Sequence, residues 1–224
     1  MSPQTPRAVI FDIDGTLLDS VDLHAKAWID AFSDFGHRVA FQDVRRQIGK
    51  GGDQLMPEFL SRSEIAAHGK ALEAHRGHVL KELYLPLMKP FPDVRALLER
   101  VRSAGAKVAL ASSAKQDELR VYKQILNIGD LTDVETCADD ADRSKPSPDL
   151  LHAVVQRLES LTPDQLIAIG DTPYDAQAAG SAGIATIGVR CGGWAEDDLW
   201  RAGCIEVYDG PTDLLARFGD WYSS

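Results

Sequence analysis

Two carboxylates, Asp12 and Asp14, stand two residues apart at the end of an apolar run, and Gly15 follows them directly. Side chains at positions i and i+2 of a strand point the same way, so both carboxylates would project from the end of the run Ala8 to Ile13. Open parallel sheets bind their ligands at such strand ends. Two like charges this close repel each other unless a cation or a proton lies between them. The pattern therefore favours a reaction in which one carboxylate is a nucleophile beside a metal and the other gives and takes a proton.

The same residues are equally compatible with a strand that ends in a polar turn, since Asp and Gly are the commonest turn residues. The Asp-x-Asp-Gly pattern is weak by itself. Partners for a phosphate and a metal after later strands would decide between the two interpretations.

Ser112 and Ser113 follow a second apolar run, Lys107 to Ala111, and precede a helical pattern. A hydroxyl and free backbone amides at a helix start suit an anion, because the helix dipole and the unsatisfied N–H groups favour negative charge. Ser112 alone would equally be a helix cap. Its place at the carboxyl end of a predicted strand favours a phosphate-binding role.

Lys145 follows a third apolar run, Val134 to Cys137. Pro146 and Pro148 restrict the backbone before a helix that Ser147 can cap, so the lysine has a stiff support. Its charge would offset that of a phosphate and of a nearby carboxylate. Without the other motifs, a lysine here would be expected to face solvent.

Asp171 and Asp175 follow a fourth apolar run, Leu166 to Ile169, one in the turn and one in the first helical turn. Carboxylate-rich oxygen sites are what Mg²⁺ prefers. Acidic capping of a helix start explains Asp175, but it does not explain two acidic strand ends in one sheet. The shared strand-end position of these motifs favours a site for Mg²⁺ and phosphate.

The apolar runs, with a fifth at Ile184 to Val189, alternate with helical patterns and predict βαβ units in a mostly parallel α/β sheet. More than ninety residues separate the first two runs, which is far longer than an ordinary crossover. We expect an α-helical insertion at 17–88 and a core formed by 1–16 and 89–224. An insertion beside a strand-end site is placed to act as a lid.

The first predicted helix of the insertion starts behind a possible Ser20 cap, with apolar residues at helical spacing up to Phe32. Further helical stretches are expected at Phe41 to Ile48, Asp53 to Leu60 and Ser63 to Leu85.

The composition is 44% hydrophobic over 224 residues, which is ample for a packed core. A formal net charge of −10 argues against a broad basic surface for nucleic acid or an anionic membrane. The three cysteines lack metal-like spacing and fit free thiols in a reducing compartment. Residues Met1 to Arg7 do not resemble a signal peptide, and no apolar run approaches membrane-spanning length. We expect a cytoplasmic monomer or homodimer.

In their order and strand-end positions, these motifs resemble those of the haloacid dehalogenase superfamily, in particular its phosphatase branch with a helical cap. The matching residues are Asp12-Ile13-Asp14-Gly15-Thr16, Ser112, Lys145 and Gly170-Asp171 with Asp175. The resemblance implies a Rossmann-like three-layer core, the cofactor Mg²⁺ and a small phosphorylated metabolite as substrate, such as a sugar phosphate or phosphoglycolate.

The resemblance also implies roles for the first motif. Asp12 would attack phosphorus and become an aspartyl phosphate, while Asp14 would protonate the leaving alcohol and then deprotonate the hydrolytic water. Thr16 would orient Asp14 through a hydrogen bond.

By the same resemblance, Mg²⁺ would be held by the Asp12 carboxylate, the backbone carbonyl of Asp14 and Asp171, with Asp175 as a ligand or as an orienting group. The phosphoryl oxygens would be bound by Ser112, Ser113 and Lys145.

Substrate choice is expected to lie in the cap. His24 falls on the apolar stripe of the first cap helix and is either a core residue or a residue at the site entrance. The turn that contains Gly49, Lys50 and Gly51 is either a linker between helices or a loop that meets the substrate.

Two other functions remain open at this level. A β-phosphoglucomutase-like phosphotransferase would use the same motifs, and His24 is compatible with it, whereas Thr16 favours hydrolysis. A non-enzymatic phosphate-binding regulator would have no need for Asp14. Dehalogenases of the superfamily lack the second aspartate and are disfavoured.

Overall fold

Six parallel strands form one sheet in the order β5-β4-β1-β6-β7-β8. A computed structural model describes residues 5–222, so the outermost ends of the predicted core, 1–4 and 223–224, lie outside the described residues. The predicted α/β class with a mostly parallel sheet is confirmed. The strands are β1 (Ala8–Phe11), β4 (Lys107–Ala111), β5 (Val134–Thr136), β6 (Leu166–Gly170), β7 (Ala185–Val189) and β8 (Glu206–Tyr208).

All five predicted strands are present, with ends that differ by two residues or fewer. The first strand stops at Phe11, although the backbone N–H of Asp12 still donates to the carbonyl of Ile169 at 2.9 Å. Strand β8 was not predicted, because it has three residues at the edge of the sheet and its first two are only half-buried.

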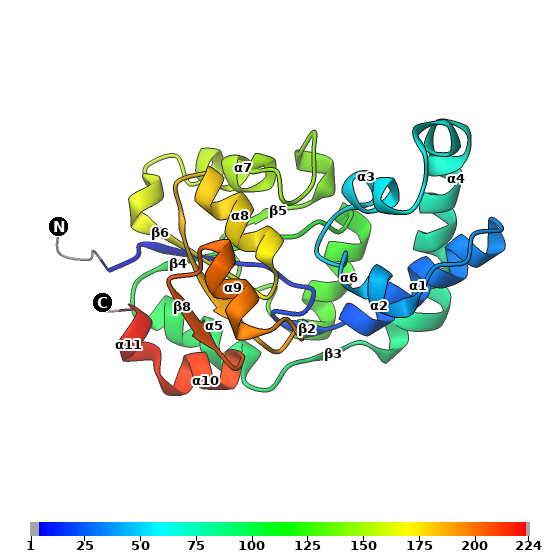
Figure 1. The fold of residues 1–224 in the computed structure, drawn as a ribbon. Helices are drawn as coiled ribbons and strands as arrows, with labels where there is room; N and C mark the ends of the chain where they lie inside the picture. Colours follow the sequence, from blue (N-terminus) through cyan, green and yellow to red (C-terminus); the bar gives the residue numbers. More distant parts are fainter. Residues whose placement is uncertain (1–4, 223–224) are drawn as a thin grey trace.

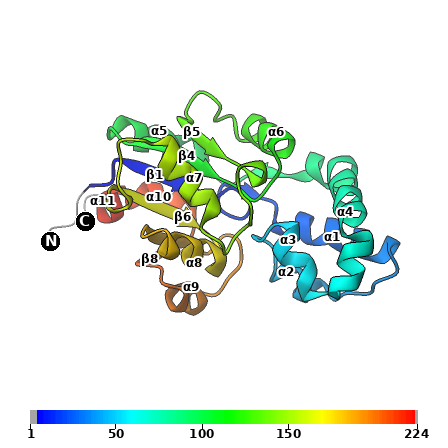
Figure 2. The ribbon, with the colours of Figure 1, turned by 90° about the horizontal axis from the view of Figure 1, so that it is seen from above.

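Both faces of the sheet are covered by helices, as expected for a parallel sheet. Val9 and Phe11 pack toward α5, α6, α10 and α11, whereas Ala8 and Ile10 pack toward α7 and α8, as the twofold period of a strand requires. The three layers are visible in Figures 1 and 2. The helices are α5 (Val94–Ser103), α6 (Gln116–Leu126), α7 (Asp149–Arg157), α8 (Pro173–Ser181), α9 (Glu196–Ala202), α10 (Pro211–Ala216) and α11 (Phe218–Tyr222).

A helical lobe follows the first strand and lies beyond the carboxyl ends of the strands (Figure 1). It has an apolar cluster of its own, which includes Trp28, Phe32, Leu55 and Leu72. Its last long helix continues into a π-helical segment, Leu80–Tyr84. The helices of the lobe are α1 (Val21–Asp34), α2 (Phe41–Arg45), α3 (Gly52–Leu55) and α4 (Arg62–Val79).

Two short antiparallel strands connect the lobe to the sheet. Strand β2 (Leu18–Asp19) leaves the core, and β3 (Lys89–Pro90) returns to it beside β2. The two chain segments between core and lobe are therefore hydrogen-bonded to each other. The bounds 17–88 for the insertion stay a prediction, and this strand pair is the structural feature closest to them.

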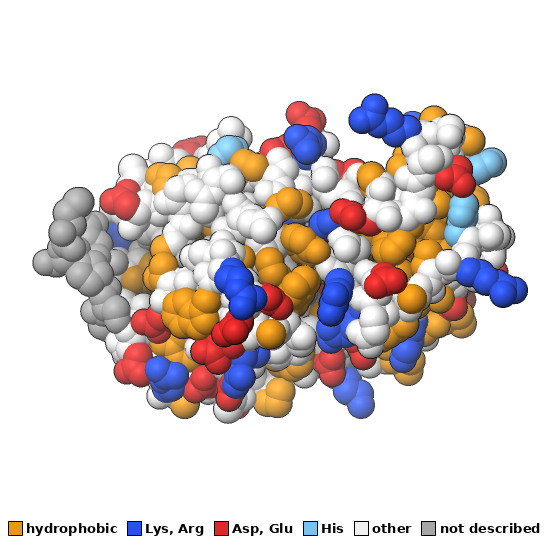
Figure 3. All heavy atoms as spheres, viewed as in Figure 1, with side chains coloured by type: hydrophobic (Ala, Val, Ile, Leu, Met, Phe, Trp, Pro, Cys, Tyr) orange, Lys and Arg blue, Asp and Glu red, His pale blue; other side chains and the backbone are white. Residues whose placement is uncertain are grey.

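The surface drawn in Figure 3 carries acidic and basic side chains interspersed with apolar ones. Within residues 5–222, no helix combines the length and the apolar character that crossing a bilayer requires.

Candidate active site

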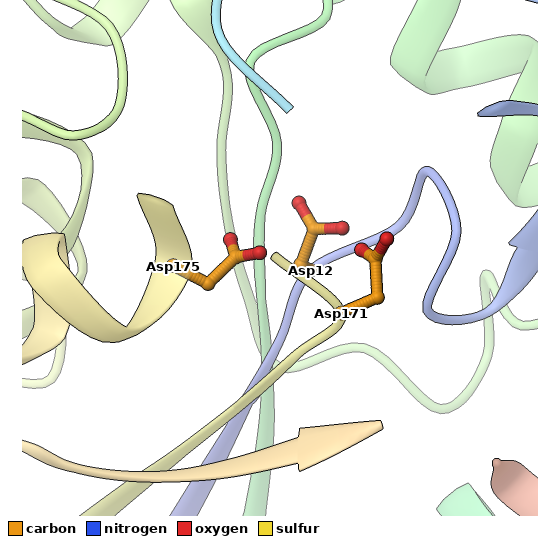
Figure 4. A group of neighbouring side chains, drawn as sticks. All are labelled: Asp12, Asp171 and Asp175. Carbon is orange, nitrogen blue, oxygen red and sulfur yellow. The ribbon is translucent and has the colours of Figure 1, made fainter. Parts of the chain in front are cut away.

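Three buried aspartates meet at the carboxyl end of the sheet (Figure 4). Asp12 follows β1 and Asp171 follows β6, and these strands are hydrogen-bonded neighbours, while Asp175 lies in the first turn of α8. One carboxylate oxygen from each residue lies within 4.8 Å of the others. The aspartates that follow the first and fourth predicted strands therefore lie close together, as expected.

Lys145 is the cation inside this cluster and is only 2% exposed. Its Nζ donates to Oδ1 of Asp12 at 2.5 Å, to Oδ1 of Asp175 at 2.7 Å and to the carbonyl of Ala111 at 2.9 Å. Burial by itself would lower the pKa of Lys145, but the charges of the two aspartates outweigh burial and raise it. The lysine is therefore held in its charged form and offsets one carboxylate charge.

One lysine does not compensate three carboxylates. Burial, only partly opposed by Lys145, raises the pKa of Asp12 to about 7, and Asp175 and Asp14 add to the rise. Burial and then the charges of Asp12 and Asp175 raise the pKa of Asp171 well above its usual range. A further cation at this position would relieve the repulsion.

The polar atoms of the cluster also fit a divalent cation. Oδ2 of Asp171 is buried and has no hydrogen-bond partner among residues 5–222. Both oxygens of Asp175, in contrast, are occupied, because Oδ1 pairs with Lys145 and Oδ2 accepts from the backbone N–H and the hydroxyl of Thr172 at 3.0 and 2.6 Å. The geometry favours Asp171 as a metal ligand and Asp175 as an orienting group.

The role predicted for Thr16 is wrong. Its hydroxyl lies 3.2 Å from Oδ2 of Asp12 and 3.1 Å from Oδ1 of Asp171, so it donates within the aspartate cluster and not to Asp14. The turn after β1 explains the difference, because Gly15 adopts a φ of 88° and the chain folds back over the strand ends.

Asp14 is held by residues at the start of the helical lobe. Its Oδ1 accepts from Oγ of Ser20 at 2.6 Å and lies 2.8 Å from Nε2 of His24, which in turn lies 3.4 Å from the hydroxyl of Tyr122. Burial tends to raise the pKa of Asp14, but the charge of His24 and the hydrogen bonds from His24 and Ser20 outweigh burial, so the pKa is lowered. His24 therefore contacts Asp14 directly.

Ser20 does not cap its helix, which corrects the sequence prediction. It occupies the N-cap position of α1, but its backbone, at φ −135° and ψ −14°, is not in the extended conformation usual for a cap, and its side chain accepts no capping bond. Its hydroxyl donates to Asp14 instead. Ser147 also fails to cap, since α7 begins after Pro148 and the Ser147 hydroxyl donates to Asp149.

The two serines after β4 have different surroundings. Ser112 is fully buried, and its Oγ accepts from the backbone N–H of Ala114 at 3.1 Å. It is not a helix cap, because α6 begins only at Gln116. Ser113 Oγ donates to the carbonyl of Gly49 at 3.1 Å and thus contacts the lobe.

The glycine-rich turn of the lobe closes over the strand ends. Gly49, Lys50 and Gly51 line one pocket together with Asp12 and Asp14. The backbone N–H of Gly51 donates to Oγ of Ser144 at 2.8 Å, next to Lys145. Lys50 Nζ donates to Gln47 at 2.6 Å and to Glu58 at 2.8 Å, so its charge is already paired. The turn is therefore a wall of the pocket.

Two charged residues that the motifs did not predict line the same pocket, Arg76 of α4 and Glu118 of α6. Arg76 lies in the last turn of a helix of mostly polar residues, where a basic residue is ordinary, and Glu118 has the pattern of an ordinary acidic first turn. Neither belongs to a motif, and nothing in the sequence indicates that they face each other.

The fold and the site define a class of enzyme: a parallel α/β core with an acidic, lysine-containing centre at the strand ends and a helical lobe over it. Comparison with known proteins leads to the family. A model described as "Haloacid dehalogenase-like hydrolase" matches residues 9–189, and the chain belongs to this family of hydrolases. The resemblance drawn from the motifs is confirmed.

Several relatives are phosphatases by name. The chain is 30% identical over 180 residues to the "Phosphorylated carbohydrates phosphatase" of Thermotoga maritima, covering 80% of this chain and 83% of the relative. It is 31% identical over 204 residues to a "Phosphoglycolate phosphatase" of Aliivibrio fischeri, covering 83% and 85%. A solved structure of a hydrolase from Pseudomonas syringae superimposes with a TM-score of 0.88 at 28% identity, over 97% of this chain and 99% of that one.

Proposed function

We propose that this protein is a Mg²⁺-dependent phosphatase that hydrolyses a small phosphorylated metabolite through an aspartyl phosphate on Asp12. The observation that carries the proposal is the environment of Asp12. This carboxylate lies between the buried cation of Lys145 and the Asp171 carboxylate, one oxygen of which lacks a partner within 5–222. The names of the relatives, which include a phosphorylated carbohydrates phosphatase and a phosphoglycolate phosphatase, support the same reaction class.

In the proposed reaction, a carboxylate oxygen of Asp12 attacks phosphorus, and the bond from phosphorus to the ester oxygen breaks. Asp14 delivers a proton to the departing oxygen. Asp14 then takes a proton from a water molecule whose oxygen attacks the phosphorus of the aspartyl phosphate, so that Asp12 and inorganic phosphate are released. Ser20 and His24 hold the Asp14 carboxylate in place for both transfers.

The metal would be held by Asp12 and Asp171 and by the backbone carbonyl of Asp14, with Asp175 fixing the position of Lys145. When bound, Mg²⁺ supplies positive charge that neutralises the carboxylates and the transferring phosphoryl group. Lys145 contributes charge from the chain itself, and Ser112 and Ser113 are the proposed donors to the phosphoryl oxygens.

The free thiols of Cys137, Cys191 and Cys204 support a reducing, cytoplasmic location. We further propose that the protein acts as a monomer or homodimer on a small metabolite.

The proposal is tested by p-nitrophenyl phosphate hydrolysis with and without Mg²⁺, in the wild type and in Asp12→Asn. We expect turnover that requires Mg²⁺ and that falls by at least about a thousandfold in Asp12→Asn, since removal of a covalent nucleophile leaves only residual catalysis. Asp34→Asn is the matched control, because Asp34 carries an exposed carboxylate that pairs with His75.

Wild-type rates in Asp12→Asn would disprove the nucleophile assignment. Incubation with a hexose phosphate separates the phosphatase from the phosphotransferase. Formation of an isomer without release of phosphate would identify the phosphotransferase.

A further inference from the structure

Arg76 and Glu118 form a buried ion pair between the helical lobe and the core. Nη1 of Arg76 lies 3.3 Å from Oε1 of Glu118, and the two side chains are 9% and 3% exposed. Both line the pocket that also contains Asp12 and Asp14. The proposed steps at phosphorus use neither residue, so the pair is available to bind the alcohol that leaves the substrate.

The pair has an unused donor. Nε of Arg76 is buried and has no hydrogen-bond partner among the described residues. The guanidinium lies over the ring of Trp28, 5.3 Å from its centroid, and Trp28 forms an apolar part of the same pocket. A buried donor without a partner costs free energy, and a ligand oxygen would remove that cost.

The pocket wall has no uncompensated positive charge among its described residues. Arg76, Lys50 and His24 are its basic residues. Arg76 is paired with Glu118, Lys50 Nζ lies 2.8 Å from Oε1 of Glu58, and His24 Nε2 lies 2.8 Å from Oδ1 of Asp14. An anionic group on the leaving alcohol would therefore meet no free cation, and it would lie near the carboxylates of Glu118 and Asp14.

We infer that the Arg76–Glu118 pair recognises hydroxyl groups of a neutral polyol leaving group, so that the preferred substrates are phosphorylated carbohydrates and not phosphoesters with a carboxylate on the alcohol. The inference rests on the proposed phosphatase function and names its substrate class. A hydroxyl accepts from an arginine N–H and donates to a carboxylate at the same time, which a carboxylate ligand cannot do.

The test compares kcat/KM for ribose 5-phosphate, glucose 6-phosphate and sorbitol 6-phosphate with kcat/KM for phosphoglycolate. The reference is p-nitrophenyl phosphate, whose leaving group carries neither further hydroxyls nor a carboxylate. For the wild type, we expect the best of the three carbohydrate phosphates to exceed phosphoglycolate by at least about tenfold, the size of effect that one hydrogen bond to a charged group gives. Glu118→Gln leaves the charge of Arg76 uncompensated. This variant should lower the ratio of carbohydrate phosphate to phosphoglycolate by about tenfold or more.

Asp117→Asn is the matched control. Asp117 is the neighbour of Glu118 and also pairs across the interface, with Lys81 at 2.5 Å, but it is exposed and does not line this pocket. Its substitution should leave the ratio unchanged, which separates recognition of the leaving group from loosening of the interface.

A wild type that hydrolyses p-nitrophenyl phosphate but prefers phosphoglycolate would overturn the inference and leave the proposed function intact. The same conclusion would follow from a ratio that Glu118→Gln does not change. If that variant does not fold, the wild-type ratio decides by itself. Absence of hydrolysis of every compound with Mg²⁺ present would instead refute the proposed function.

Discussion

Nε2 of His24 lies 2.8 Å from Oδ1 of Asp14, so a residue on the first helix of the lobe contacts the proposed acid and base of the core. Ser20, one helical turn earlier, bonds to the same oxygen. The position of α1 is thereby linked to the position of the proton-transferring carboxylate.

His24→Asn tests the electrostatic side of this contact. The charge of His24 and its hydrogen bond help to lower the pKa of Asp14 against the effect of burial, so their loss should raise that pKa. The ionised form of Asp14 accepts the proton from water, and activity is lost as the pH falls through its pKa. At saturating Mg²⁺, whose charge favours the ionised form of Asp12, the acid limb of the kcat profile should therefore move to higher pH in the variant.

His75→Asn is the control for this experiment, because His75 pairs with Asp34 at 2.7 Å on the surface of the lobe, away from the site. Superimposable acid limbs for the wild type and His24→Asn would refute the proposed influence on Asp14.

Asp171→Asn should separate metal binding from folding. The buried carboxylates of Asp12, Asp171 and Asp175 repel one another, so an amide at 171 should raise the Tm of the metal-free protein. The same variant should lose the rise in Tm that millimolar Mg²⁺ gives the wild type, and it should need about 10- to 100-fold more Mg²⁺ for activity. Thermal unfolding with and without Mg²⁺ measures both changes in Tm. A wild-type Tm that does not change when Mg²⁺ is added would argue against the metal site.

Lys145→Met should destabilise the protein strongly. The change leaves Asp12 and Asp175 buried without their shared cation, which costs about 3 kcal/mol or more in the free energy of unfolding. The loss should shrink as the pH falls toward 7, because burial, only partly opposed by Lys145, raises the pKa of Asp12 to about 7 in the wild type. Without the lysine, Asp12 is protonated at higher pH than in the wild type, and its protonated form needs no cation. Urea unfolding at several pH values measures this dependence.

Lys81→Met is the control for Lys145→Met. It removes a lysine from the exposed ion pair with Asp117 and should cost about 1 kcal/mol or less. Equal losses of unfolding free energy in the two variants would mean that Lys145 stabilises its buried cluster no more than an exposed lysine stabilises a surface ion pair.

Gly192→Ala tests how tightly the position of Asp171 is fixed. A Cβ on Gly192 would lie 1.7 Å from Oδ2 of Asp171, so the carboxylate or the loop must move. We expect activity to fall by about a hundredfold, as for a displacement of about 1 Å in a catalytic centre.

Gly180→Ala is the matched substitution, since a Cβ at this exposed position in α8 meets nothing within 4 Å. It should stabilise the protein by up to about 1 kcal/mol and leave turnover unchanged. Normal kcat in Gly192→Ala would show that the Asp171 carboxylate tolerates displacement.

The sheet could be predicted from the sequence because its strands are buried on both faces and read as continuous apolar runs. The run Lys107 to Ala111 matches β4 residue for residue. Strand β8 has no such run. Its pairing with β7 is a tertiary contact that the residues Glu206 to Tyr208 do not specify locally.

Local side-chain bonds were harder to predict. The sequence pattern predicted a helix cap for Ser20, and the family resemblance implied a bond from Thr16 to Asp14; both partners are short-range. In the structure each hydroxyl donates to a carboxylate at the site: Ser20 to the partly buried Asp14, and Thr16 within the buried pair Asp12 and Asp171.

The sequence by itself determined which side chains meet at the proposed centre, because Asp12, Asp14, Lys145 and Asp171 follow strands and parallel strands bring their carboxyl ends to one edge of the sheet. The tertiary structure alone decided what faces that centre from the lobe. Arg76 and Glu118 are 42 positions apart on different helices, and their pairing depends on how the lobe packs against the core. That packing is set by long-range contacts, which the local sequence pattern does not contain.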